Sequence, residues 1–420
     1  MTERVRCCVA GGGPAGVMLG LLLARAGVDV VVLEKHRDFL RDFRGDTVHP
    51  STLRLLDELG LGERFARLPR GVLEQMHLRI GGTEIAEVTM ADFRRIPGRH
   101  KHIAMVPQAD LLGLLAGAGR AEPTFDLRMG CAVVGLLREH GRVTGVRYRD
   151  QHSGIHELRA TLTVGCDGRW STVREALGLR LREFAVPMDV WQVRVPKGAD
   201  PKQDKGVFGR FGGGQAAVTM DRDDYYQTSY LIPKGQDAVL RKESLAEFRA
   251  RLGDLFGWDT AQLAAITSWE DVKFLDVRMG RLDRWHADGA LCVGDAAHPM
   301  SPVGGVGVNL AIQDAVATAA LLAEPLRRGR VTTGELAAVR RRRWLPMAAV
   351  QRSQLGEHAM LIKPALEGTL HADRLPVPLR LVRRMPFLRG VAAYLGGVGL
   401  RPEHAPPFAR RSPSSLDSPL

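Results

Sequence analysis

The pattern of apolar and polar residues predicts strands and helices in turn along the first part of the chain. Residues 5–10 and 28–33 are short apolar runs of the kind that form buried strands. Residues 14–25 between them are apolar over the length of a helix. This order of strand, helix and strand predicts an α/β arrangement at the start of the chain.

Further along, apolar and polar residues alternate at period two, which predicts antiparallel hairpins. Residues 133–138 and 143–149 alternate on either side of the turn signal His140-Gly141, and strand-like runs dominate from 188 to 228. We expect further strands over 76–80, 84–89, 267–277 and 290–293, and helices over 52–61, 109–116, 245–252, 260–266, 306–322 and 333–355. The middle of the chain is therefore predicted to form a mostly antiparallel sheet, and its end to be helical.

A glycine-rich turn, Gly11-Gly12-Gly13-Pro14-Ala15-Gly16, follows the first strand. Gly11 begins a tight turn, Gly13 allows the backbone to approach a pyrophosphate, and Gly16 allows the helix to pack closely on the strand. Glu34, at the end of the second strand, is placed to accept hydrogen bonds from ribose hydroxyls. The segment predicts nucleotide binding rather than a turn without a ligand, but it does not by itself separate FAD from NAD(P).

Two later segments have the shape of further contacts to the same nucleotide. Asp167-Gly168 ends a strand, and Ser171 after it is placed to cap a short helix. Gly294-Asp295 ends another strand, where Asp295 can accept a hydrogen bond from a polyol hydroxyl or, alternatively, only cap a turn. The backbone N–H groups of residues 307–309 begin a helix and can stabilise negative charge on a reduced flavin. Three such segments in this order indicate an FAD-binding protein.

Together these motifs resemble the group A flavoprotein monooxygenases, the para-hydroxybenzoate hydroxylase-like family, from residue 5 to about residue 320. The resemblance implies an α/β fold, in which a Rossmann-like FAD-binding domain of the glutathione reductase type is interleaved with a mostly antiparallel β-sheet substrate domain, plus C-terminal helices. It implies FAD contacts from Gly11, Gly13, Ala15, Gly16, Glu34, Lys35, Arg44, Gln108, Asp167, Asp295, Gly307, Val308 and Asn309. It also turns the carbonyl of Pro302 toward the substrate. The chain departs from the family at this point, because Ser301-Pro302 replaces the usual pair of prolines.

On this resemblance the two domains alternate along the chain. We expect the FAD-binding domain over 1–75, 105–183 and 281–330, the substrate domain over 76–104 and 184–280, a C-terminal helical region over 331–406, and a disordered tail over 407–420.

The family chemistry implies that NADPH or NADH reduces FAD and that O2 then forms a flavin C4a-hydroperoxide, which oxygenates an aromatic or lipophilic small molecule. No catalytic triad or metal-binding cluster is evident in the sequence, and His49 is the candidate for a catalytic side chain facing the pocket. One alternative is an FAD-dependent reductase of an isoprenoid or quinone-type substrate, and another is a non-catalytic binding protein on the same scaffold. A halogenase is disfavoured because the Trp-x-Trp-x-Ile-Pro motif is absent.

Composition places few further limits on the protein. Charged residues make up 25% and hydrophobic residues 45% of 420 residues, as in an ordinary soluble globule. The five cysteines lie mostly in apolar runs, which favours buried thiols in a reducing cytoplasm, and we expect no membrane-spanning segment. The formal net charge of +12 comes without a nucleic-acid recognition motif, so we expect no nucleic-acid partner. The oligomeric state stays open.

The C-terminal residues 363–401 combine short apolar runs with arginines. One interpretation is a cap packed on the substrate domain with its arginines in solvent, and it is favoured because the apolar runs are short. The other is a surface that dips apolar residues into a membrane while arginines meet anionic head groups.

Overall fold

A parallel sheet forms the centre of the computed structural model, which describes residues 3–40, 47–81, 85–198, 206–222 and 224–412. Its strands lie in the order β20 (Ala290–Cys292), β11 (Ile155–Gly165), β1 (Arg4–Ala10), β2 (Val30–Glu34) and β8 (Phe125–Met129). Each is parallel to its neighbour, and β19 (His286–Ala287) adds an antiparallel edge. Both faces of this sheet are covered, which explains why its central strands are continuous apolar runs.

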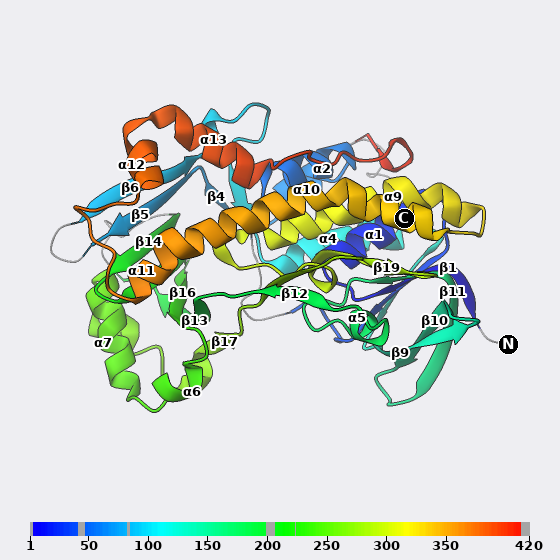
Figure 1. Cartoon of the computed structure of the whole chain (residues 1–420), viewed down its shortest axis with the longest axis horizontal. Helices are drawn as coiled ribbons and strands as arrows, with labels where there is room; N and C mark the ends of the chain where they lie inside the picture. Colours follow the sequence, from blue (N-terminus) through cyan, green and yellow to red (C-terminus); the bar gives the residue numbers. More distant parts are fainter. Residues whose placement is uncertain (1–2, 41–46, 82–84, 199–205, 223, 413–420) are drawn as a thin grey trace.

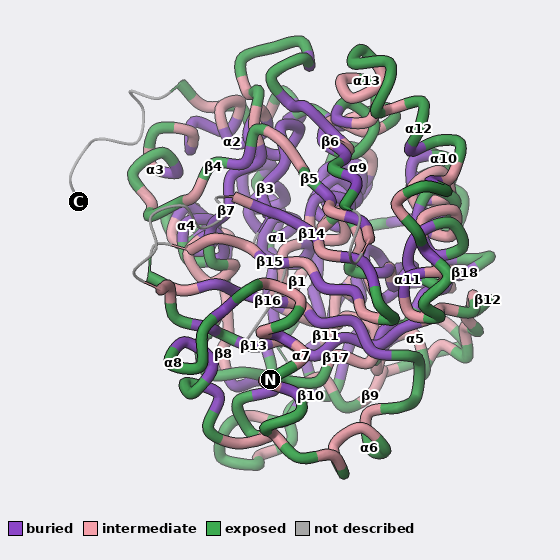
Figure 2. The backbone as a smooth tube through the Cα atoms, turned by 90° about the vertical axis from the view of Figure 1, so that its left-hand side faces the viewer, coloured by how far each residue is buried: buried purple, intermediate pink, exposed green. Residues whose placement is uncertain are grey.

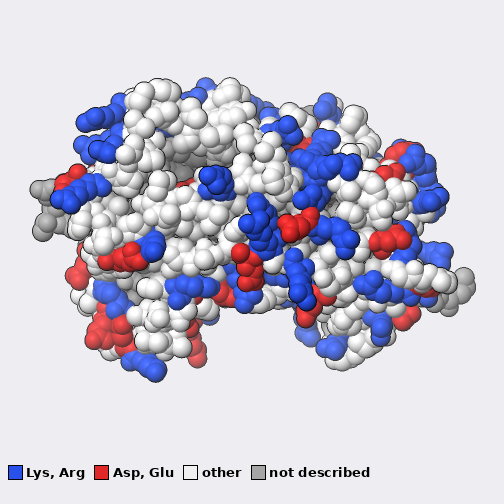
Figure 3. Space-filling model, viewed as in Figure 1, with Lys and Arg blue, Asp and Glu red and all other residues white. Residues whose placement is uncertain are grey.

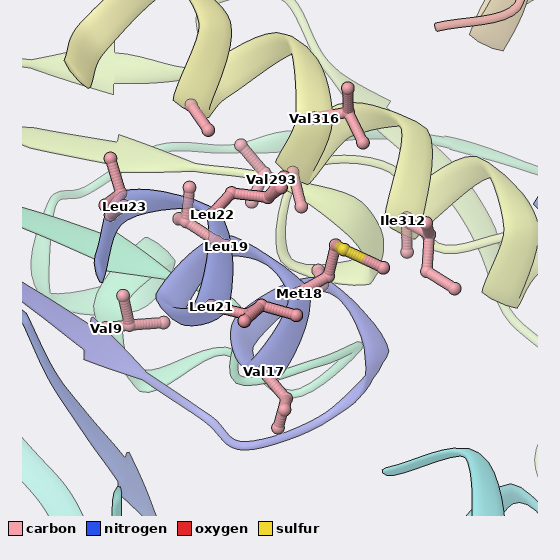
Figure 4. Close-up of a cluster of buried hydrophobic side chains, with 14 of the residues drawn as sticks. Val9, Val17, Met18, Leu19, Leu21, Leu22, Leu23, Val293, Ile312 and Val316 are labelled. Carbon is pink, nitrogen blue, oxygen red and sulfur yellow. The ribbon is translucent and has the colours of Figure 1, made fainter. Parts of the chain in front are cut away.

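Helices cover one face of the sheet and a three-stranded antiparallel extension covers the other (Figure 1). The helices are α1 (Pro14–Arg25), α4 (Gln108–Arg120) and α9 (Gly307–Arg327). The extension pairs the long strand β11 with β10 (Arg142–Arg149), and β10 with β9 (Ala132–Glu139). Side chains of β1 alternate between the two layers: Cys7 and Val9 pack with the helices, and Cys8 packs with the extension. Figure 4 shows the core between α1 and α9.

A second, seven-stranded sheet lies beside the first. Its order is β17 (Lys273–Leu275), β13 (Met188–Pro196), β16 (Tyr225–Pro233), β15 (Gln215–Asp221), β14 (Val207–Gly212), β5 (Gln75–Ile80) and β6 (Ala86–Asp92). Every neighbouring pair is antiparallel except β14 and β5. The predicted fold class, an FAD-type α/β domain joined to a mostly antiparallel sheet with C-terminal helices, is confirmed.

The two faces of this second sheet meet different parts of the chain. Trp191 lies on the face covered by α7 (Leu245–Phe256) and α8 (Thr260–Leu263). Val190, one residue earlier, lies on the opposite face, which packs with Val303 of the loop before α9. The face that carries Val190 is therefore the one turned toward that loop.

The C-terminal part of the chain forms one long helical run followed by two shorter helices. In Figure 1, α10 (Thr333–Glu357) runs across the molecule and continues as a π-helix over His358–Ile362 and then as α11 (Lys363–Leu366). After it, α12 (Val377–Arg384) and α13 (Pro386–Gly397) pack on β6.

The smaller elements are β3 (Thr47–Val48), α2 (Pro50–Glu58), α3 (Gly62–Ala66), β4 (Gly71–Leu73), β7 (Ile103–Met105), α5 (Thr172–Ala176), β12 (Leu181–Phe184), α6 (Asp237–Leu240) and β18 (Met279–Leu282).

Two local expectations are wrong. The strand predicted over 267–277 is interrupted by a 3-10 helix, Trp269–Asp271, because the Ser268 and Asp271 side chains bond to nearby backbone N–H groups and divert the chain into a turn. Disorder was predicted from residue 407, but Pro407–Ala409 forms a 3-10 helix whose Ala409 is fully buried. The carbonyl of Ala409 accepts a hydrogen bond of 2.8 Å from Arg25, which ties this segment to α1.

One helical segment, Val303–Arg327, is long and apolar enough by composition to cross a membrane. Within the protein, however, 72% of its most apolar window is buried. This segment contains α9, so its apolar character is explained by its place in the core of the FAD-type domain.

Candidate functional site

The glycine turn and Glu34 lie together at the carboxyl end of the central strands. Gly11 has a φ of 100°, and a Cβ there would lie 2.5 Å from the Cys166 carbonyl oxygen. A Cβ on Gly16 would lie 1.8 Å from the carbonyl oxygen of Gly11. Helix α1 can therefore pack this closely on the turn only because residue 16 is a glycine. The buried Glu34 carboxylate accepts a hydrogen bond of 2.8 Å from the Gly12 N–H. The predicted nucleotide motif is therefore assembled as one compact unit.

Two helix N-termini at this edge of the sheet have space for an anionic ligand. The N-cap of α1 is Gly13, which has no side chain to cap the helix, and a Cβ added there would meet nothing within 4 Å. At α9 the N-cap is Val306, whose side chain cannot accept a hydrogen bond, and a Cβ added to the first helical residue, Gly307, would also meet nothing within 4 Å. Because N-terminal N–H groups and the helix dipole favour negative charge, the pair suits a pyrophosphate and a reduced flavin. The residues present therefore fit FAD.

The Asp167 segment is bonded to the neighbouring Asp295 segment, and a direct cofactor contact of Asp167 stays a prediction. The Asp167 carboxylate accepts hydrogen bonds from the Ser171 hydroxyl at 2.5 Å and the Val173 N–H at 3.0 Å, and burial raises its pKa. Arg174, the third residue of α5, donates to the carbonyl of Ala296 at 3.0 Å. In the part of the chain that the structure describes, the half-buried Asp295 side chain has no hydrogen-bonding partner. Its carboxylate is thus available for a ligand hydroxyl.

Asn309 joins the start of α9 to the segment that leads into α2. Its amide oxygen accepts hydrogen bonds from the His49 N–H at 2.9 Å and the Thr52 hydroxyl at 2.8 Å. Its amide nitrogen donates to the Thr47 carbonyl at 3.0 Å. The side chain therefore mainly joins these segments, and the backbone N–H of Asn309 is predicted to face a flavin.

His49 is the N-cap residue of α2 and is almost fully buried, with an exposed fraction of 2%. Its Nδ1 lies 2.9 Å from the carbonyl oxygen of Gly396 in α13. Burial lowers its pKa to about 4, although the nearby carbonyls of Gly396 and Gly305 favour the protonated ring. The geometry therefore makes His49 a neutral link between α2 and α13, and a catalytic role for it stays a prediction.

The pKa of His49 predicts a loss of stability in weak acid. The pKa of His49 in the folded protein, about 4, is below the ordinary value of 6.5. Between these two pH values the unfolded chain binds more protons than the folded protein, so folding becomes less favourable as the pH falls. We expect the free energy of unfolding to fall by about 2 kcal/mol from this group between about pH 7 and pH 5. Urea unfolding of the wild type and of His49→Asn, which keeps a donor at the δ position, measures it. Equal pH dependence in the two proteins would contradict the assignment.

The loop before α9 is held by residues that lie outside the predicted motifs. The Ser301 hydroxyl lies 2.8 Å from Nε2 of His358, and both residues are buried. Gln354 donates to the carbonyl oxygens of Ser301 and Val303, each at 2.8 Å. The replacement of a family proline by Ser301 was the one signal of this arrangement in the sequence. Pro302 beside it is exposed at the start of the 3-10 helix Val303–Gly305.

A buried charge network supports the Asp295 segment from behind. Asp314 of α9 accepts hydrogen bonds from the Gly294 N–H at 3.2 Å, His298 Nε2 at 2.5 Å and Arg343 Nε at 2.9 Å. Burial alone would raise the pKa of Asp314, but the charges of His298 and Arg343 hold it below its usual value. Arg343, which is 1% exposed, reaches on toward Glu403. The network thus links the Gly294-Asp295 segment, α9, α10 and the C-terminal segment.

The remaining predicted cofactor residues are less fully placed. Lys35 is exposed directly after β2, and Gln108 is the half-buried first residue of α4. Ala15 is buried in the first turn of α1, and Val308 is half-buried in the first turn of α9. Arg44 lies outside the described residues. Direct cofactor contacts of these residues stay predictions.

Comparison with known proteins identifies the family. Residues 4–353 match the family model described as FAD binding domain, FAD_binding_3. The chain is 35% identical over 392 residues to 6-methylpretetramide 4-monooxygenase from Streptomyces rimosus, which covers 91% of this chain and 90% of that protein. It is 31% identical to rifampicin monooxygenase from Streptomyces venezuelae, of whose length it spans 61%.

Solved structures agree with this relationship. The anhydrotetracycline hydroxylase OxyS from Streptomyces rimosus superimposes with a TM-score of 0.73 at 25% identity, covering 96% of this chain and 77% of that one. The chain therefore belongs to the FAD-binding family of group A FAD-dependent monooxygenases and is a flavoprotein monooxygenase.

Proposed function

We propose that the protein hydroxylates an aromatic polyketide with the help of one non-covalently bound FAD, using NADPH or NADH and O2. The observation that carries this proposal is the 35% identity, over nine tenths of both chains, to a monooxygenase named for a pretetramide substrate. When bound, the flavin supplies the activation of oxygen, and the protein supplies binding, orientation and exclusion of water.

In this proposal the cofactor lies along the carboxyl edge of the parallel sheet. The N-terminus of α1 and Gly13 face the pyrophosphate, and Glu34 faces a ribose. Asp295 accepts a hydrogen bond from the polyol, and the N-terminus of α9 faces the flavin ring. The substrate lies between the ring and the sheet face that carries Val190, near Pro302.

The first test is the cofactor itself. We expect a yellow protein whose flavin is released on denaturation, so that a colourless pellet remains.

Asp295→Ala should weaken FAD binding by about tenfold or more, because one hydrogen bond with a charged partner contributes about 1.5–3 kcal/mol. The measurement is flavin fluorescence on titration of the apoprotein. Asp254→Ala, at an exposed carboxylate of α7, is the matched control. Equal affinity in both variants would remove Asp295 from the site.

The second test is the reaction. A panel of polyketide, phenolic and quinone-precursor compounds should reveal a substrate that accelerates NAD(P)H oxidation and consumes one O2 per hydroxylated product. Substrate reduction without O2 uptake would instead support the reductase alternative. A protein that stays colourless with added FAD would support a non-catalytic role.

A further inference from the structure

Helix α13 presents its large apolar side chains to solvent and its small residues to the protein. Phe387, Val391 and Leu395 recur at helical spacing and are 58%, 48% and 48% exposed. On the opposite side, Ala393 is fully buried. Gly397 also belongs to the inner side, because a Cβ there would lie 2.8 Å from the ring of Phe93. The inner face of α13 therefore packs closely on the protein. Its outer face is apolar and largely exposed to solvent.

Helix α12 extends the same apolar surface. Val377, Leu381 and Met385 are 55%, 45% and 40% exposed, whereas Leu379 is buried against the second sheet. Figure 2 shows both helices largely exposed on the outside of the molecule. We refer to the exposed residues Val377, Leu381, Met385, Phe387, Val391, Tyr394 and Leu395 as the α12–α13 surface. An exposed apolar surface of this extent usually marks an interaction site.

The charged residues of the segment that forms this surface have one sign, and Asp373 lies directly before it. Residues 374–401 contain arginines at 374, 380, 383, 384, 389 and 401, and no aspartate or glutamate. Arg380, Arg383 and Arg384 are exposed. Figure 3 shows uncharged atoms over α12 and α13 with basic side chains at their margin, next to a hollow in the same face. A second copy of this chain would bring arginines against arginines, so an anionic partner is favoured.

We propose that the α12–α13 surface docks on an anionic lipid bilayer, with its apolar side chains at the acyl boundary and its arginines among the head groups. This is the second of the two interpretations of the C-terminal sequence. The structure changes the balance between them, because α13 packs on β6 through small residues and both helices leave most of their large apolar residues outside. The proposal goes beyond the monooxygenase reaction and does not depend on the identity of its substrate.

Docking would occur close to the cofactor loops. The carbonyl of Gly396 is bonded to His49, and the carbonyl of Gly397 accepts a hydrogen bond of 3.2 Å from Ser51. His49 is in turn bonded through its N–H to Asn309 at the start of α9. The bilayer surface would therefore lie next to the segment that leads into α2 and the start of α9.

The test is co-sedimentation of the FAD-loaded protein with vesicles of phosphatidylcholine and phosphatidylglycerol, and of phosphatidylcholine alone, at low and high salt. We expect binding to the anionic vesicles that weakens with salt. Arg383→Glu/Arg384→Glu and Phe387→Ser/Leu395→Ser should each reduce it by on the order of tenfold or more. The matched controls are Arg147→Glu/Arg149→Glu, two exposed arginines of β10 at the other end of the molecule, and Ile155→Ser, which is 54% exposed.

Flavin content and unfolding midpoint show that each variant is folded, so the vesicle result is independent of turnover. Absence of wild-type binding at low salt would overturn the proposal, as would equal loss in the control variants. A wild-type dimer that Phe387→Ser/Leu395→Ser converts to a monomer would also overturn it and assign the surface to a second copy.

Discussion

Replacing Asp314 by alanine is expected to lower the free energy of unfolding by about 3–5 kcal/mol, because it leaves a buried charge without its partner. Asp314 is fully buried, and Arg343, from whose Nε it accepts a hydrogen bond, is 1% exposed. The variant also removes the acceptor of the Gly294 N–H, which positions the Asp295 segment. FAD affinity should therefore fall together with stability.

Urea unfolding measures the first effect and flavin titration the second. Glu324→Ala on the same helix is the matched control, since its ion pair with Arg327 is exposed and should contribute at most about 1 kcal/mol. Adding Arg343→Met to Asp314→Ala should recover part of the loss, because the buried guanidinium that has lost Asp314 is then removed and Glu403 keeps Arg342 as a partner. Similar losses for Asp314→Ala and Glu324→Ala would show that the network is not important for stability.

The parts of the site that could be predicted from the sequence are those decided by neighbouring residues. The glycine turn, its helix and Glu34 follow one another within one short segment, and each has a steric or electrostatic reason that does not depend on the rest of the chain. The Asp314 network could not be found in this way. Arg343 lies 29 residues from Asp314, and Ser301 lies 57 residues from His358. Contacts of this kind depend on how α10 crosses the two sheets.

The C-terminal helices illustrate a different limit. Helical spacing separates two faces of α13, but it does not say which face is inside. The usual expectation that large apolar residues are buried fails here, because Phe93 and β6 leave room only for glycine and alanine on the inner side. The strand predicted over 267–277 failed for a local reason, since side-chain hydrogen bonds from Ser268 and Asp271 compete with strand pairing.

Gly13→Ala is expected to separate folding from cofactor binding. A Cβ at Gly13 meets nothing within 4 Å, and the backbone there, with φ −74° and ψ −173°, is extended and accessible to alanine. The apoprotein should therefore keep its unfolding midpoint. FAD affinity should fall by about tenfold to a hundredfold, because the methyl group would occupy the space that the pyrophosphate needs and weaken charge-assisted hydrogen bonds of about 1.5–3 kcal/mol.

Two other glycines provide the contrast. Gly16→Ala should destabilise even the apoprotein, by about 1–3 kcal/mol or more, because its Cβ would lie 1.8 Å from a backbone oxygen. Gly113→Ala, at an exposed position of α4 with nothing within 4 Å, should bind FAD normally and raise stability by about 0.5–1 kcal/mol. Thermal unfolding and flavin titration of the three variants distinguish these outcomes. If Gly13→Ala binds FAD as tightly as Gly113→Ala does, the pyrophosphate does not approach the N-terminus of α1 at this residue.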